Sequence, residues 1–292
     1  MKFKHWLAFI LLGAIWSSSF LWIKIGVQEI SPTLLVALRV LFGALTGLLA
    51  ILLTRTPLPS QKGTWFALAL LGVTNVALPF FLITWGEKSI DSAVAAILNA
   101  TVPLFTLVIA HFYLQDERLN LPRLLALLIG FAGVVILLVK NFDPTSHNSI
   151  IGQGAVLLAT ISYAFSAVYA RLKTDRVPGL VRGIMPVVSG SLVMWVATFA
   201  TTPHISLPEL PITWLAVLWL GVLGTGIAFI LWYYLLQEIG PTRTTLVTYL
   251  LPLGGVILGV VFLKEPLSWN LLLGGVLIVL SVWVVNRKSG GH

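Results

Sequence analysis

The chain has 292 residues, of which 58% are hydrophobic and only 10% are charged. So few polar residues cannot cover the surface of a soluble globule, so a soluble fold is excluded and a location in a lipid bilayer is expected. The net charge of +8 does not point to nucleic acid, because membrane proteins concentrate Lys and Arg in cytoplasmic loops. The chain has no cysteine, which excludes disulfides and thiolate metal sites.

Ten apolar runs of about 20 residues, the length that crosses a bilayer, follow one another along the chain. The predicted spans are residues 6–27, 33–54, 64–85, 90–114, 121–140, 150–172, 181–202, 213–236, 241–263 and 269–286. Turn and helix-breaking residues, such as Ser31-Pro32 and Glu265-Pro266, separate the runs. The first run follows Lys2 and Lys4 and resembles a signal peptide, but it lacks a clean cleavage site and is expected to remain as a helix. We predict an all-α polytopic membrane protein.

The distribution of positive charge predicts how the spans are oriented. Most of the 18 Lys and Arg residues fall in segments on the same side as the N-terminus. The segments on the other side hold only Lys24, Lys88, Lys140 and Lys264. Because cytoplasmic loops carry the excess of positive charge, both termini are predicted to lie in the cytoplasm of a multi-pass protein of the cell membrane.

The two halves of the chain share one pattern. Residues 83–136 and 232–284 each contain a polar hinge, an apolar run around one proline, an acidic turn and a second apolar run. The paired residues are Pro103 and Pro252, Glu117 and Glu265, Trp16 and Tyr163, and Lys24 and Arg171. We predict two repeats and a short tail, at residues 1–143, 144–288 and 289–292. Because five spans per repeat is an odd number, the second repeat is predicted to cross the membrane inverted relative to the first.

Polar and aromatic side chains recur near the middle of equivalent spans in both halves. The candidate substrate-binding residues are Trp16, Asn75, Asn99, Tyr163, Thr225, Thr248 and Tyr249. Because polar groups in hydrocarbon need partners, we expect these side chains to face the interior or a wet cavity. The alternative for any one of them is a hydrogen bond between helices without a ligand.

Three prolines lie at the same level as these polar residues. Proline removes the backbone donor to the carbonyl four residues earlier, so Pro79, Pro103 and Pro252 are candidates for kinks or gating points. The alternative is a static packing role. Small residues such as Gly255 and Gly259 are interpreted as helix contacts.

Ionisable residues are scarce within the spans. Arg39 is the one fixed charge inside a span and is a candidate for attracting an anionic group, with snorkelling or pairing to Glu29 as the alternative. His111, near the end of the fourth span, is a possible proton carrier, with an interfacial role as the alternative. The ten acidic residues all fall in loops or at helix ends, which argues against proton antiport driven by a mid-membrane carboxylate. We read Glu117 and Glu265 as structural turns and leave them out of the site.

No catalytic constellation is present in the sequence. The chain has no HExxH and no GxSxG motif, its acids are not paired within a span, and its five histidines lie far apart without metal-ligand spacing. We therefore expect no enzyme, no cofactor and no metal. An intramembrane enzyme and a non-transporting receptor or scaffold are the alternatives from other classes.

Two strings carry a family resemblance. The first is AIWSSSFLWIKIG, and the second is YLLPLGGVILGVVFLKEPLSWNLLLGGVLIVLSVWVV with its LKEP turn. Both resemble the EamA repeat of the drug/metabolite transporter superfamily, and the resemblance covers nearly the whole chain. It departs from the family in two places, at Trp16-Ser17, where Trp-Gly is common, and at Leu251, where many members have Glu before the proline.

The resemblance implies a ten-helix exporter of small metabolites with a central cavity formed by the first, third, fourth, sixth, eighth and ninth spans. We expect a carrier for neutral or zwitterionic amphipathic compounds, such as amino acids, that works by alternating access. The runner-up is a broad-specificity drug exporter. The sequence sets no expectation for the substrate itself, the coupling ion or the oligomeric state.

Overall fold

The computed structural model describes residues 2–115, 120–139, 148–202 and 205–286. In these residues the chain forms helices and no strands. Nine of the helical segments are long and apolar enough to cross a membrane, and a shorter apolar helix, residues 269–284, lies in the last predicted span. The ten observed segments lie within a few residues of the predicted spans, so the prediction of an all-α polytopic fold is confirmed.

Six spans are single helices and four are interrupted. The single helices are α1 (Phe3–Gly26), α2 (Pro32–Thr54), α7 (Leu121–Val139), α8 (Ile150–Lys173), α9 (Gly179–Thr201) and α14 (Trp269–Asn286). The interrupted spans are α3 (Lys62–Leu71), η1 (Gly72–Ala77) and α4 (Leu78–Gly86); α5 (Ser92–Asn99) and α6 (Val102–Tyr113); α10 (Pro211–Leu218), η3 (Trp219–Ile227) and α11 (Ala228–Ile239); and α12 (Pro241–Thr244), η4 (Thr245–Tyr249) and α13 (Leu250–Leu263).

The interruptions fall at matching places in the two halves. The third and eighth spans each contain a stretch of π-helix, η1 and η3, while the fourth and ninth spans break at Ala100–Thr101 and at the 3-10 segment η4. Pro79 and Pro103 sit in the first turn of the helix that follows each break, where a missing N–H costs least. The irregular backbone therefore lies at one level of the bundle in both halves.

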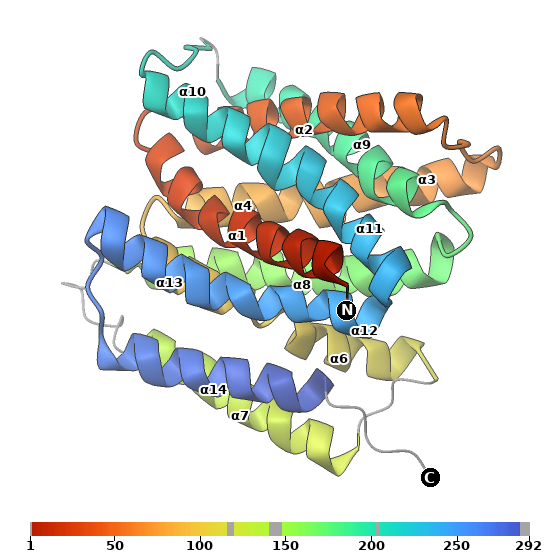
Figure 1. Ribbon diagram of the computed structural model, residues 1–292. Helices are drawn as coiled ribbons and strands as arrows, with labels where there is room; N and C mark the ends of the chain where they lie inside the picture. Colours follow the sequence, from red (N-terminus) through yellow and green to blue (C-terminus); the bar gives the residue numbers. More distant parts are fainter. Residues whose placement is uncertain (1, 116–119, 140–147, 203–204, 287–292) are drawn as a thin grey trace.

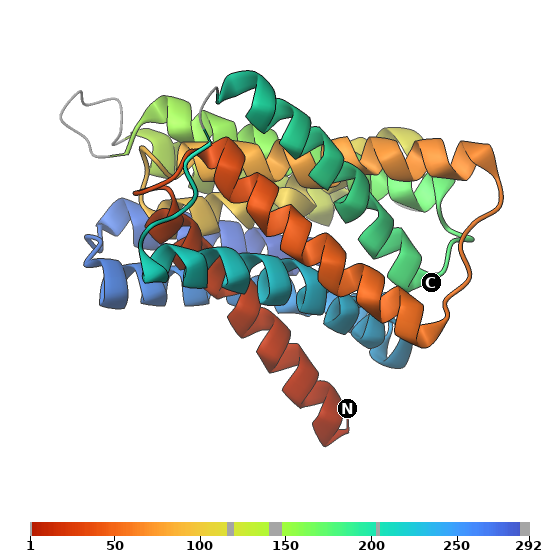
Figure 2. The same ribbon diagram turned by 90° about the horizontal axis from the view of Figure 1, so that it is seen from above.

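The fifth span of each half, α7 and α14, packs side by side at one edge of the bundle (Figure 1). The opposite edge is formed by α2 and α9, which cross each other when the bundle is seen from above (Figure 2). Gly133 and Gly274 face each other where α7 meets α14, and a Cβ added at either would lie 2.8 Å from the carbonyl oxygen of the other. Glycine at both positions therefore lets the two backbones touch.

We expect Gly133→Ala to destabilise the protein by about 1–3 kcal/mol, because the new methyl group pushes α7 away from α14. Gly154→Ala in α8 is the matched control, since no atom lies within 4 Å of its added Cβ. Thermal unfolding in detergent, followed by tryptophan fluorescence, should show a lower melting temperature for Gly133→Ala alone. Equal melting temperatures for the two variants would contradict this account of the contact.

Candidate functional site

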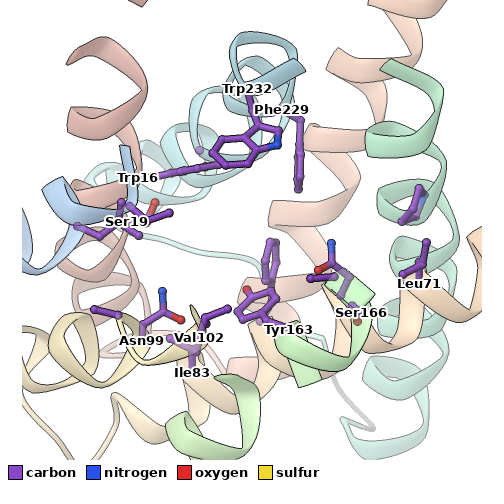
Figure 3. A pocket seen from close by; sticks show the side chains of 18 of the residues that line it. Trp16, Ser19, Leu71, Ile83, Asn99, Val102, Tyr163, Ser166, Phe229 and Trp232 are labelled. Atoms are coloured by element: carbon purple, nitrogen blue, oxygen red, sulfur yellow. The ribbon is translucent and has the colours of Figure 1, made fainter. Parts of the chain in front are cut away.

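A cavity of about 400 Å³ lies inside the helix bundle. Spans of both halves contribute to its wall, which Figure 3 shows from close by. The wall includes the six spans implied by the family resemblance, together with α2 through Arg39 and α9 through Arg182 and Pro186. The cavity is thus shared between the two halves of the chain, where the predicted repeats would place a site at their interface.

Aromatic rings form much of the wall. Trp16 of α1 and Trp232 of α11 lie in contact, with ring centroids 5.3 Å apart. In Figure 3 these two rings and Phe229 lie across the open space from Tyr163 of α8. Such rings offer large, stiff apolar faces to a ligand while the Tyr163 hydroxyl and the indole N–H groups keep a polar atom. One side of the cavity can therefore hold an apolar group.

Uncharged polar side chains stand among these rings at the level of the backbone breaks. Asn75 of η1, Asn99 at the end of α5 and Thr248 of η4 all line the cavity. The Thr248 hydroxyl donates a hydrogen bond of 2.8 Å to the carbonyl oxygen of Thr245, so it is already engaged. Oδ1 of Asn99, in contrast, is buried and has no hydrogen-bond partner. Because an unsatisfied buried carbonyl oxygen is costly, Asn99 is a wall residue that would gain from a hydrogen-bond donor on a ligand.

Arg39 brings a buried positive charge to the wall. Its guanidinium carbon lies 3.9 Å from the ring centroid of Phe80, and Nε donates a hydrogen bond of 3.1 Å to Oγ1 of Thr225. The hydroxyl of Thr225 in turn donates to the carbonyl oxygen of Leu220, which fixes its orientation. Within the described parts of the chain, no carboxylate forms an ion pair with Arg39.

The alternative role of Arg39, a pairing with Glu29, is not observed. Glu29 accepts hydrogen bonds from the backbone N–H groups of Glu209 and Leu210 at the start of the eighth span. Those N–H groups lie at the N-terminal end of α10, where a carboxylate is favoured. Arg39 is only 6% exposed and turns inward, so snorkelling to the membrane surface is also absent.

The other candidates divide into those on the wall and those behind it. Trp16, Asn75, Asn99, Tyr163, Thr248, Pro103 and Arg39 line the cavity. Thr225 is fully buried behind Arg39, and Pro79 and Pro252 are buried among the helices. Tyr249 packs against the cluster that contains Leu104 and Leu107, away from Thr248, because one residue of a 3-10 helix turns the side chain by about 120°. His111 lies in the last turn of α6, away from the wall.

Sequence reasoning missed several wall residues. Phe229, Trp232 and Tyr233 follow each other in the aromatic string FILWYY of α11, which we did not single out. Ser166 lies one turn after Ser162 on α8, and its hydroxyl oxygen lies 2.8 Å from both the Ser162 carbonyl oxygen and Oγ1 of Thr74. The third span carries a similar string in the first half, FFLITW at residues 80–85, and Phe80 and Ile83 of this string also line the cavity. Comparing the two halves could therefore have found both strings.

The two ends of the cavity are built differently. Following the predicted orientation, we call the end of the bundle with Lys24, Glu87 and Glu265 the outer end, and the end with Lys4 and Arg182 the inner end. The cavity wall continues toward the inner end as far as Arg182, in the first turn of α9, and Tyr233. There the carboxylate of Glu238 on α11 lies 2.9 Å from Nε2 of His5 and 3.5 Å from Nζ of Lys4, both at the start of α1.

At the outer end, hydrogen bonds join segments that are far apart in the sequence. Nζ of Lys24 donates to the carbonyl oxygens of Glu87 and Ile90, both at 2.7 Å. The carboxylate of Glu265 accepts from the backbone N–H groups of Ser92, at 2.7 Å, and Ala93, at 3.0 Å. We call the segment Glu87–Ala93, which receives these bonds, the outer latch. None of its residues lines the cavity, and Glu87, Ile90 and Ser92 are buried. We therefore infer that the outer latch covers the outer end of the cavity.

Glu265 was read as a structural turn, and its two bonds hold the N-terminus of α5 in the other half of the chain. Glu117, its predicted counterpart, lies outside the described residues. A hydrogen bond also joins Asp91 of the outer latch to Asn148, before α8, at 2.7 Å. The outer latch thus receives contacts from α1, from the α13–α14 turn and from the segment before α8.

Comparisons with known proteins give a consistent result. The profile of the EamA-like transporter family matches residues 4–139 and 150–287. An Escherichia coli protein named as the uncharacterized inner membrane transporter YedA is 30% identical over 92% of this chain and 87% of its own. The uncharacterized transporter YoaV of Bacillus subtilis is 25% identical over 96% of each chain. A solved crystal structure covers 99% of this chain and 100% of its own with a TM-score of 0.69 at 23% identity, which shows a shared fold.

Proposed function

Since this chain belongs to the EamA-like transporter family and is a membrane transporter, we propose that it exports small amphipathic metabolites that carry a carboxylate, such as zwitterionic amino acids. The single observation that carries the proposal is the buried Arg39, without a carboxylate partner among the described residues, on the wall of an aromatic cavity. A cavity of about 400 Å³ is in the usual range for small-molecule sites.

Each part of such a solute has a matching group on the wall. Arg39 would attract the carboxylate, because a guanidinium presents several N–H donors to an anion. The rings of Trp16, Trp232 and Tyr163 would enclose the apolar part, and the amide of Asn99 would meet the remaining polar groups. These roles rest on where the side chains lie relative to the cavity.

The charge of the wall separates this proposal from the broad drug exporter. The wall includes Arg39 and Arg182 and no Asp or Glu among its described residues. A cationic dye or drug would meet a repulsive charge there without a counter-ion, whereas an anionic or zwitterionic solute would not. The lining therefore favours the metabolite over the cationic drug.

Alternating access is the mechanism that we propose for this site. The outer latch holds the outer end closed, while the cavity wall reaches toward the inner end. Matching backbone breaks in the two halves provide flexible points at equivalent depths. Export would then require the outer latch to open and the contact between His5 and Glu238 at the inner end to tighten or persist. We place the protein in the plasma membrane, in keeping with the name of the E. coli relative. The distribution of positive charge supports a cytoplasmic position for both termini.

We expect the double variant Trp16→Ala with Asn99→Ala to raise the KM for export by roughly tenfold or more, because an aromatic contact and a hydrogen bond are lost together. The measurement is efflux of amino acids from preloaded proteoliposomes. Trp6→Ala is the matched control, since Trp6 lies on the same helix but is 51% exposed outside the cavity. Unchanged kinetics in the double variant for every transported compound would show that this cavity is not the site.

A further inference from the structure

Glu87 is a buried carboxyl group that the proposed substrate site does not use. It directly follows α4, at the beginning of the outer latch, and its exposed fraction is 0%. Neither oxygen of its carboxyl group has a hydrogen-bond partner. A side chain of this kind is expected on a protein surface, so its full burial without a partner needs an explanation.

The charged groups around Glu87 are engaged with other atoms. Lys24 of α1 gives its hydrogen bonds to the backbone carbonyl oxygens of Glu87 and Ile90. Arg39 of α2 bonds Thr225, and Glu265 accepts from the N–H groups of the outer latch. The α8 helix, which packs on α4, brings the uncharged Gln153 to this end.

An ionised Glu87 would be unstable in this surrounding. Burial raises the pKa of Glu87 well above its ordinary value, Lys24 and Arg39 oppose the rise, and the negative charge of Glu265 adds to it. The desolvation of the carboxylate outweighs the pull of the two cations because no donor reaches its oxygens. The neutral form of Glu87 is therefore favoured over the carboxylate in the closed outer end.

Opening of the outer end changes this surrounding. Lys24 and Glu265 hold the segment that Glu87 begins, so their bonds must break if the cavity is to reach the outer face. Water that enters would then hydrate the Glu87 carboxyl and return its proton affinity toward that of an exposed glutamate. Closing reverses these events.

We propose that Glu87 is a proton-binding site of this transporter, which takes up a proton when the outer latch closes and releases it when the outer latch opens. The assignment rests on the alternating access of the proposed function and goes beyond it by naming the ligand, a proton, and the group that binds it. The sign follows from linkage. Protonation of Glu87 favours the closed outer latch, so acid outside the membrane favours closing. This stabilisation of the closed state is lost as the pH rises from the ordinary pKa of an exposed glutamate toward the raised pKa of the buried Glu87.

Glu265 is a second buried acid at the outer end, and unlike Glu87 it has a structural role. It is also buried, at 8% exposure, but both of its oxygens accept a backbone N–H at a helix N-terminus. A carboxylate in this position is stabilised as the anion. Replacing Glu265 by glutamine should weaken the latch without removing its response to pH, which makes it the matched control for Glu87.

The natural absence of cysteine allows a direct test of the outer latch. Ser19→Cys places one thiol on the cavity wall, and a membrane-impermeant maleimide added outside intact cells reports whether the outer end opens. We expect its labelling rate, corrected for the rate of a free thiol at each pH, to rise with external pH, by up to about tenfold per pH unit where one proton is released. Adding Glu87→Gln, which mimics the neutral acid, should hold the rate at its low acid value at every pH.

Two further variants and two outcomes decide the assignment. Glu87→Asp should keep the response to pH, and Glu265→Gln should keep it while raising the rate at every pH. A pH response that persists in Glu87→Gln would overturn the proton site and leave alternating access intact. Labelling that is absent from both faces of the membrane at every pH would overturn alternating access, and the proton site with it.

Discussion

Replacing Arg39 by glutamine is expected to reduce the transport of carboxylate-bearing solutes by about 10- to 100-fold in kcat/KM. Hydrogen bonds to a charged group contribute about 1.5–3 kcal/mol, and the substitution removes one or more of them from a buried wall. Transport of an analogue in which the carboxylate is replaced by a neutral amide should be reduced far less. Competition assays with the acid and the amide in proteoliposomes measure this difference.

Substitutions at two other residues separate the effect of the Arg39 charge from the effect of its packing. Thr225→Val keeps the shape of the side chain that receives Nε of Arg39, and should cost only a few-fold because the charge remains. Arg182→Gln removes the other cation of the wall, which lies 4.0 Å from Asp175 at the inner end. An equal loss for the acid and its amide in Arg39→Gln would show that Arg39 supports the fold and does not bind substrate.

Replacing Glu265 by alanine is expected to lower the stability of the protein by about 3 kcal/mol, because two charge-assisted hydrogen bonds to the N-terminus of α5 are lost. The freed N–H groups of Ser92 and Ala93 would stay inside the protein, since both residues are buried. For a chain of this size the melting temperature should fall by about 5 °C.

Glu209→Ala is the control for this loss, because Glu209 lies at the same end of the bundle and is exposed. Thermal unfolding in detergent should distinguish the two variants, with Glu209→Ala close to the parent protein. Glu265→Gln should fall between them, because one amide oxygen can still accept a hydrogen bond without the charge. A melting temperature for Glu265→Ala that equals the parent value would show that the two bonds add nothing to stability.

The spans were predictable because the length of an apolar run is set by the thickness of the bilayer. The breaks near Pro79 and Pro103 were predictable as well, since proline removes a backbone donor. The break in the eighth span was not, because η3 contains no proline and its three glycines, Gly221, Gly224 and Gly226, are also compatible with a regular helix.

The site was predictable only in part, because depth along a helix is easier to predict than direction around it. Mid-span position identified Trp16, Asn99 and Tyr163, which line the cavity, but it also selected Tyr249, whose side chain points away. The burial of Glu87 could not be predicted from the sequence. Its position at the end of a span indicates exposure, and only the packing of α1, α8 and the α13–α14 turn around it removes the water.

The contact of Gly133 with Gly274 has a mechanical consequence. It joins the last helix of one half to the last helix of the other, and neither α7 nor α14 contributes a described residue to the cavity wall. Under the proposed alternating access, two halves that rock against each other would need an axis about which they turn, and this close backbone contact at the edge of the bundle would provide one. Substitutions along this axis should therefore change how fast the halves rock while the choice of solute stays the same.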